Sequence, residues 1–226
     1  IESVSKINEE LQYLPGINGF QFTNYGNCIT EGSSSANSKR VIVTGIIDPY
    51  MILEQKTKYK GINYNVPHIN DNEEIISRGK WDLFCTPKIL VAGMTKIIEA
   101  TLDDNGSLAP GVSVYSIIGS LENLKYTLGV INSRLINWYF KLRFKDKHLE
   151  GGYISINTQI LKTIPIAQAT EISKQRIGEI VDNILNAKKS DPNADTTALE
   201  TEIDQMVYQL YNLTPEEIEI IESSSG

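Results

Sequence analysis

The hydrophobic pattern of the chain is most regular between residues 121 and 144. Apolar side chains recur there at spacings of three and four residues, and this periodicity places them on one face of an α-helix. The face consists of Leu124, Leu128, Ile131, Leu135, Trp138, Tyr139 and Leu142. We therefore predict one long helix that packs into the core, followed by a basic loop and a glycine pair.

Strand-like segments precede and follow this helix. Residues 40–47 (RVIVTGII) are rich in β-branched side chains and end at Asp48-Pro49, which favours a turn. Similar patterns predict strands at residues 88–94, 97–102, 112–118 and 153–156. Asp104-Asn105-Gly106 predicts a hairpin turn between the second and third of these strands. Near the N-terminus we predict a helix within residues 1–14, a short strand within 19–27 and a loop at 31–38.

Helical patterns return after Pro165. Residues 171–189 carry the apolar stripe Ile172, Ile177, Ile180, Ile184 and Leu185, and residues 195–211 carry a second stripe. The two segments predict a helical hairpin, and Thr214 with Pro215 predicts the start of a short last helix. The predicted fold class is α+β, a mixed or antiparallel sheet with a long core helix, followed by a C-terminal helical hairpin. We predict two domains, residues 1–169 and 170–226.

Composition limits the class of protein. Apolar residues make up 41% of the 226 residues and charged residues 22%, as in a globular protein with a hydrophobic core. No apolar run is long enough to predict a membrane span. The chain begins without an initiator methionine or a signal-peptide pattern, so we expect a piece of a longer, cytoplasmic polypeptide. Cys28 and Cys85 form no disulfide framework or metal pattern, and we expect both to be reduced.

The net charge of −7 is distributed unevenly. Residues 1–169 contain 17 Lys and Arg against 16 Asp and Glu, whereas residues 170–226 contain 4 against 12. The first segment holds three basic clusters that suit a polyanion, because Lys and Arg neutralise phosphates. The clusters are Lys56, Lys58, Tyr59 and Lys60; Arg78, Lys80 and Trp81; and Lys141, Arg143, Lys145, Lys147 and His148.

Side chains in and near these clusters suggest how DNA would be held. Lys56, Lys58 and Lys60 alternate, which would place all three on one face of a strand. Tyr59 and Trp81 could stack on bases. Polar loop residues could read adenine edges, namely Asn63, Asn65, Asn70 and Asn72. A solvated lysine face is the alternative interpretation of each single cluster.

The sequence contains few candidates for catalysis. Asp48-Pro49-Tyr50 resembles part of the Asn/Asp-Pro-Pro-Tyr motif of amino-methyltransferases, but it lacks the second proline, and a turn is the better interpretation. Asp103-Asp104 precedes Asn105-Gly106 and is interpreted in the same way, rather than as a metal site. A hydrolase built around His68 or His148 is a further hypothesis. We predict no catalytic residue and no metal ligand in this chain.

The order of several short motifs resembles a known family. The motifs are Trp81-Asp82-Leu83-Phe84, Pro87-Lys88-Ile89-Leu90, Ile98-Glu99-Ala100-Thr101-Leu102-Asp103, Ser113-Val114-Tyr115, Leu128-Gly129-Val130-Ile131-Asn132-Ser133, Ile136-Asn137-Trp138-Tyr139-Phe140 and Ile164-Pro165-Ile166. This series is similar to the TaqI-like C-terminal specificity (target-recognition) domain of type IIG, Eco57I-like restriction-modification enzymes. The resemblance covers residues 75–166, and the closing motif departs from the family by lacking a second proline.

The resemblance implies a reader of DNA sequence within an adenine-specific DNA methyltransferase, often fused to an endonuclease. The implied partners are double-stranded DNA and the methyltransferase domain of the same parent chain, without a membrane. The parent would use S-adenosylmethionine, and Mg²⁺ if a nuclease is present; this chain lacks the motifs for both, so we expect no cofactor in it. The expected DNA contacts are Lys56, Lys58, Tyr59, Lys60, Arg78, Lys80, Trp81, Arg143, Lys145 and Lys147.

A different class of function stays open. The apolar face of the C-terminal hairpin also suits a protein-interaction module that binds a partner and leaves DNA alone. Reversing the charge of Lys56, Lys58 and Lys60 separates the two hypotheses, because only DNA binding needs these positive charges.

Overall fold

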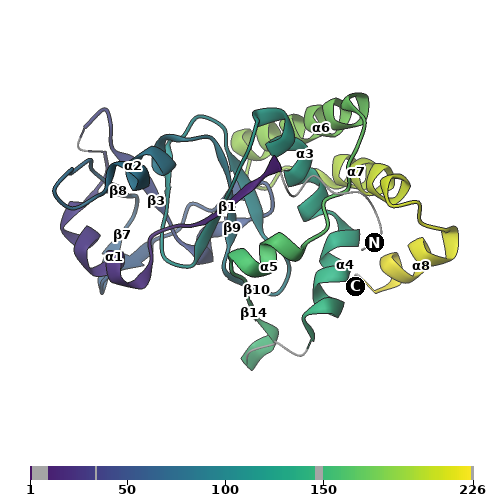
Figure 1. Cartoon of the computed structure of the whole chain (residues 1–226), viewed down its shortest axis with the longest axis horizontal. Coiled ribbons are helices and arrows are strands. Elements are labelled where there is room, and N and C mark those ends of the chain that lie inside the picture. The colour runs from purple at the N-terminus through teal and green to yellow at the C-terminus, as the bar shows by residue number, and fades with distance from the viewer. Residues whose placement is uncertain (2–9, 34, 146–149, 225–226) are drawn as a thin grey trace.

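The computed structural model describes residues 1, 10–33, 35–145 and 150–224. Its central layer is an antiparallel sheet with the strand order β1 (Gln12–Pro15), β13 (Val114–Ile118), β9 (Lys88–Ala92) and β11 (Ala100–Asp103). Figure 1 shows helices gathered on one side of this sheet and a second β-region on the other side. The predicted α+β class is confirmed.

The second β-region is built on a mixed sheet. Its strand order is β12 (Leu108–Pro110), β3 (Lys39–Ile42), β8 (Pro67–Ile69) and β2 (Ile29–Glu31), with β12 parallel to β3 and the other neighbours antiparallel. Helices α1 (Gly19–Tyr25) and α2 (Arg78–Cys85) belong to this region, which has its own hydrophobic cluster. Because β12 follows β11, the chain crosses between the two sheets at residues 104–107. The predicted hairpin at Asp104-Asn105-Gly106 is therefore wrong: β11 and β13 both pair with β9 instead.

Short ribbons and turns complete the β-structure. The ribbons are β4 (Ile47–Asp48) with β5 (Met51–Ile52), β6 (Thr57–Tyr59) with β7 (Ile62–Tyr64), and β10 (Met94–Thr95) with β14 (Ile154–Ser155). The 3-10 helices are η2 (Gly26–Cys28), η3 (Thr44–Ile46) and η5 (Glu150–Gly152). The long strand predicted at residues 40–47 is thus divided by η3 into β3 and β4.

The single helix predicted at residues 121–144 is two helices, α3 (Leu121–Asn132) and α4 (Arg134–Arg143). Ser133 breaks the helix because its backbone is extended, with ψ of 156°. Its hydroxyl accepts a hydrogen bond from the Ile136 amide and so caps α4. The predicted apolar face is buried from Leu124 to Tyr139, except that Trp138 is half-buried. Leu142 is 50% exposed, so the expectation of a buried Leu142 is wrong.

Two predictions near the N-terminus are also wrong. Residues 12–15 form strand β1, not the end of a helix, because they pair with β13 across the sheet. Residues 19–25 form helix α1, not a strand, and a capping box between Asn18 and Gln21 explains why the helix begins there. Residues 2–9 lie outside the described part of the chain.

The C-terminal helices follow the prediction. After α5 (Thr158–Thr163), the chain forms α6 (Glu171–Ser190), α7 (Thr197–Leu210) and α8 (Pro215–Ser223), and Thr214 and Glu217 form a capping box at α8. Ile172 is the exception, since it is 82% exposed and does not belong to the buried stripe. Within the described residues, no helix has the length and apolarity needed to cross a membrane.

One hydrophobic cluster joins the central sheet, α3 and α4 to α6 and α7. At Gly129 of α3, a β-carbon would lie 2.7 Å from Cγ2 of Ile177, so a larger residue would force α6 to shift away from α3 or Ile177 to move. The cluster spans the predicted domain boundary between residues 169 and 170. That boundary stays a prediction.

Candidate nucleic-acid interface

The first basic cluster lies on the β6–β7 ribbon. Lys56, Lys58 and Lys60 are exposed, whereas Thr57 and Tyr59 between them are buried, as the alternating pattern predicts. Lys60 has a left-handed backbone (φ 49°), and its Nζ donates to the Thr23 carbonyl in α1 at 3.1 Å. Lys56 and Lys58 therefore offer the more accessible charges for a phosphate.

The two aromatic residues predicted to stack on bases are buried. The Tyr59 ring lies 4.3 Å from the Phe22 ring, and its hydroxyl donates to the Phe22 carbonyl at 2.9 Å. Trp81 packs edge-on against Phe84 in the same cluster. Neither ring presents a face to solvent in this conformation, which does not favour stacking on bases; the stacking role stays a prediction. The alternation that exposes the lysines also assigns Tyr59 to the opposite face, so the sequence contained this information.

The two cations of the second basic cluster have different surroundings. Arg78 and Asp82 form an ion pair on the surface of α2, with Nε and Oδ1 3.0 Å apart. Lys80 points inward, and its Nζ donates to the carbonyls of Pro15 (3.2 Å) and Gly16 (2.8 Å). Burial lowers the pKa of Lys80. Lys80 thus fastens α2 to the end of β1, while Arg78 remains accessible to DNA.

The third basic cluster lies at the end of α4. Lys141, Arg143 and Lys145 are exposed, and the Arg143 guanidinium lies 6.0 Å from the ring of Phe144, a buried residue. Positive side chains are favourable there because they oppose the negative end of the helix dipole. Lys147 and His148 lie outside the described residues.

A further cation and an aromatic ring come together on the β10–β14 ribbon. Lys96 follows β10 and Tyr153 precedes β14, and the Lys96 Nζ lies 5.3 Å from the centre of the Tyr153 ring. Sequence reasoning missed both residues, because they are far apart in the chain and only the strand register brings them together.

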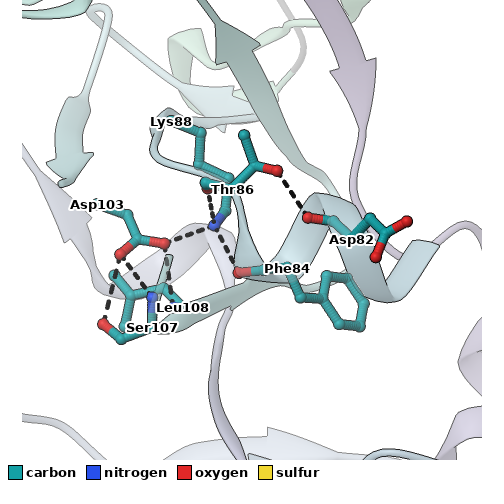
Figure 2. Close-up of polar contacts among 7 residues, drawn as sticks. All are labelled: Asp82, Phe84, Thr86, Lys88, Asp103, Ser107 and Leu108. Atoms are coloured by element: carbon teal, nitrogen blue, oxygen red, sulfur yellow. Dashed lines mark hydrogen bonds and ion pairs between the residues drawn. The ribbon is translucent and has the colours of Figure 1, made fainter. Parts of the chain in front are cut away.

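Lys88, the lysine of the Pro-Lys-Ile-Leu motif, forms a buried ion pair that Figure 2 shows. Its Nζ lies 2.5 Å from Oδ2 of Asp103 and also donates to the carbonyls of Phe84 and Thr86, both at 3.0 Å. The Asp103 carboxylate in turn accepts from the amides of Ser107 and Leu108. Burial lowers the pKa of Lys88, and the Asp103 carboxylate opposes this effect. The pair joins α2, the central sheet and the crossing to the second sheet.

Asn132 and Asn137, which belong to two of the family motifs, hold the segment between β10 and β11 against the break between α3 and α4. The Asn132 amide donates to the Ala100 carbonyl at 3.0 Å. The Asn137 carbonyl oxygen accepts from the Ile98 amide at 2.6 Å, and its Nδ2 donates to the carbonyl of Asn132. These motifs therefore position the strand that follows the β10–β14 ribbon.

Two tyrosines hold the closing Ile-Pro-Ile motif. The Tyr211 hydroxyl of the C-terminal segment donates to the Pro165 carbonyl and accepts from the Ala167 amide. The Tyr126 hydroxyl of α3 donates to the Ala167 carbonyl at 2.6 Å. Burial raises the pKa of both hydroxyls, so they stay protonated donors at neutral pH.

The candidate catalytic groups have ordinary surroundings. The His68 Nδ1 lies 3.0 Å from the Val66 carbonyl, Cys28 is buried, and Cys85 is exposed; both cysteines are free thiols. In the part of the chain that the structure describes, no group of three or more His, Cys, Asp and Glu residues could hold a metal ion. His148, the other histidine of the hydrolase hypothesis, lies outside the described residues.

Comparison with known proteins decides the family. Residues 47–166, just over half of the chain, match the TaqI-like C-terminal specificity domain. The chain belongs to this family. The matched region contains every predicted DNA contact, the buried Lys88–Asp103 ion pair and the β10–β14 ribbon.

Solved structures include an enzyme with a similar fold. The type IIL restriction-modification enzyme MmeI, solved in complex with DNA, matches with a TM-score of 0.58 and 12% sequence identity. The match covers 94% of this chain and 36% of the MmeI chain, so this TaqI-like domain spans about a third of that enzyme's length. At this identity the likeness shows the fold alone. No curated protein matches the chain.

Proposed function

We propose that this chain recognises a DNA sequence for a type II restriction-modification enzyme of which it is one part. The observation that carries the proposal is the membership of residues 47–166 in a family of specificity domains. The MmeI complex supports it, because an enzyme with this fold in its chain binds DNA. The parent is proposed to be a cytoplasmic, type IIG, adenine-specific DNA methyltransferase that uses S-adenosylmethionine. A fused endonuclease would add Mg²⁺.

The distribution of charge supports this role. Exposed cations lie on the β6–β7 ribbon, on α2 and at the end of α4, whereas the excess of carboxylates lies in residues 170–226. In Figure 1, α7 and α8 lie at the opposite end of the molecule from β7 and α1. A duplex can therefore contact the basic ribbon and remain distant from most of the acidic helices.

The first experiment measures the salt dependence of duplex binding by the complete polypeptide that contains this chain. The logarithm of the binding constant should fall linearly with the logarithm of salt concentration, with a slope of about −0.9 per neutralised phosphate. Replacing Lys56 and Lys58 by Gln should weaken binding to all sequences and reduce the slope by about 2 if each contacts one phosphate.

Lys189→Gln is the matched control, because Lys189 is an exposed lysine at the end of α6. It should leave the slope unchanged. Absence of duplex binding by the complete polypeptide at low salt would overturn the proposed function.

The proposed methyltransferase activity needs a separate readout. DNA from cells that express the complete polypeptide should carry N6-methyladenine within one sequence motif, which sequencing of modified bases detects. Methylation at cytosine, or no methylation, would contradict the proposal for the parent while leaving DNA recognition to the binding experiment.

An apolar groove favours the protein-interaction module as a second candidate. The groove lies between α4 and α8, and its volume is about 430 Å³. It is lined by Ile1, Leu135, Trp138, Leu213, Glu217, Ile220 and Ile221. The methyltransferase domain of the parent is the proposed occupant. Charge reversal of Lys56, Lys58 and Lys60 should abolish DNA binding and preserve the contact between the groove and the methyltransferase domain. Trp138→Lys should preserve DNA binding and abolish that contact. This result would assign the groove to a partner.

A further inference from the structure

The β10–β14 ribbon has one buried and one exposed face. Thr95 and Ile154 form the buried pair of the ladder, and Met94 and Ser155 form the exposed pair. The same register places Lys96 opposite Tyr153, in agreement with the 5.3 Å distance between the amine and the ring. The exposed face therefore consists of Met94, Ser155, Lys96 and Tyr153.

This exposed face combines apolar surface with a cation. Met94 is 48% exposed and Tyr153 is 42% exposed, although both are large side chains that a folded protein usually buries. Lys96 is also exposed, with its amine over the Tyr153 ring, and none of the four residues is acidic. Such a face suits a partner that offers both hydrogen-bond acceptors and apolar groups.

The ribbon has a rigid base. The amides of Gly93 and Met94 donate to the Thr44 hydroxyl at 3.0 and 3.2 Å, and the Ile156 amide donates to the Gly93 carbonyl at 2.9 Å. Gly93 is required there, since a β-carbon would lie 2.3 Å from the Ser113 carbonyl oxygen. The Asn137 anchor fixes the chain beyond the ribbon at Ile98. The exposed side chains are thus presented by backbone that the core holds in place, as base contacts require.

The segment that leads from α4 to the ribbon begins with basic residues. The chain connects α4 to β14 through residues 144–153, and α4 and β14 end at the same side of the molecule in Figure 1. At the end of α4, the described cations are Lys141, Arg143 and Lys145. The exposed cations Lys141, Arg143 and Lys145 can neutralise phosphates on a groove edge beside the ribbon.

We propose that the β10–β14 ribbon enters the major groove of the duplex and reads bases with Met94, Lys96 and Tyr153. The major groove is about 12 Å wide and admits a two-stranded β-ribbon. There, a lysine amine can donate to guanine O6 and N7, and an apolar side chain can contact the thymine methyl group. Lys56 and Lys58 would then contact the backbone and fix the position of the domain.

This inference rests on the proposed function and adds which residues specify the sequence. The experiment selects bound duplexes from a pool with randomised bases, using the complete polypeptide, and sequences the bound fraction. Met94→Ala, Lys96→Ala and Tyr153→Ala should each lower discrimination at one or two base positions by roughly five- to one-hundred-fold. Tyr153→Phe tests whether the ring is sufficient without its hydroxyl.

Two matched controls separate base reading from other effects. Lys58→Ala should select the unchanged motif with weaker binding to every sequence. Ile172→Ala, which removes an exposed apolar side chain in the C-terminal segment, should change neither motif nor affinity.

The outcomes distinguish the inference from the proposed function. Loss of discrimination confined to the ribbon variants supports the inference. Uniform weakening by the ribbon variants, or an unchanged motif with unchanged affinity, overturns it while the proposed function stands. Absence of duplex binding by the unmodified polypeptide overturns both.

Discussion

Replacement of Lys88 by Met tests the buried ion pair that joins the two sheets. The Lys88 and Asp103 side chains are 0% and 1% exposed, so neither charge is hydrated in the folded protein. Met has nearly the shape of the lysine stem, so the substitution removes the charge and three hydrogen bonds without leaving a large cavity. The Asp103 carboxylate then keeps only neutral donors, the Ser107 and Leu108 amides and the Ser107 hydroxyl, and loses its positive partner.

The expected decrease in the free energy of unfolding follows from leaving the Asp103 charge without its positive partner. Removing one partner of a buried ion pair typically costs about 3–5 kcal/mol, because the other charge stays buried without its partner. A domain of this kind has a free energy of unfolding of about 5–15 kcal/mol, so Lys88→Met should remove a large part of it. The double variant with Asp103→Asn should lose less than Lys88→Met alone, because it also removes the stranded charge.

Urea unfolding, followed by circular dichroism at pH 7, gives the free energy of unfolding by linear extrapolation. Arg78→Ala is the matched control, because the Arg78–Asp82 pair lies on α2 with both side chains more than half exposed. An exposed pair of this type contributes about 0–1 kcal/mol. If Lys88→Met costs no more than Arg78→Ala, the argument that the pair holds the sheets together is refuted.

Two further variants test other parts of the structure. Burial raises the pKa of Asp204 to about 6, although the Arg134 amide and guanidinium partly lower it. Folding therefore favours the protonated form of Asp204. The resulting stability is present below pH 4 and is lost as the pH rises through 6. Asp204→Asn should remove about 3 kcal/mol of this pH dependence of the free energy of unfolding, measured by urea unfolding from pH 4 to 8. An unchanged pH dependence would contradict the assignment to Asp204. Asn137→Ala leaves the Ile98 amide without its acceptor, so it should lower the free energy of unfolding by about 1–3 kcal/mol and speed hydrogen exchange at residues 95–98. Equal exchange rates in variant and wild type would show that this hydrogen bond is dispensable.

Local signals were sufficient where a segment is long and repeats its pattern. The helices at residues 171–190 and 197–210 follow from apolar residues at helical spacing, and the start of α8 follows from Thr214 and Pro215. The exposed lysines of the β6–β7 ribbon follow from alternation of period two. The motif order indicated the family without any structure, and the family comparison confirmed it.

Short segments were predicted less well, because distant partners decide them. Residues 12–15 are a strand only because β13 lies beside them, and residues 121–144 form two helices because Ser133 caps α4 rather than continuing α3. The sequence could show that aromatic residues lie among lysines, but burial in the second hydrophobic cluster decides that Trp81 faces inward.

By itself, the sequence determined the fold class, the C-terminal helices, the family and the basic clusters within the nearly neutral first 169 residues. Only the tertiary structure decided which charges are free for DNA. It directs Lys80 to the end of β1 and Lys88 to Asp103, and it places Lys96 beside Tyr153 on an exposed ribbon. The physical reason is that a lysine's role depends on the groups around its amine, and residues distant in the sequence supply those groups.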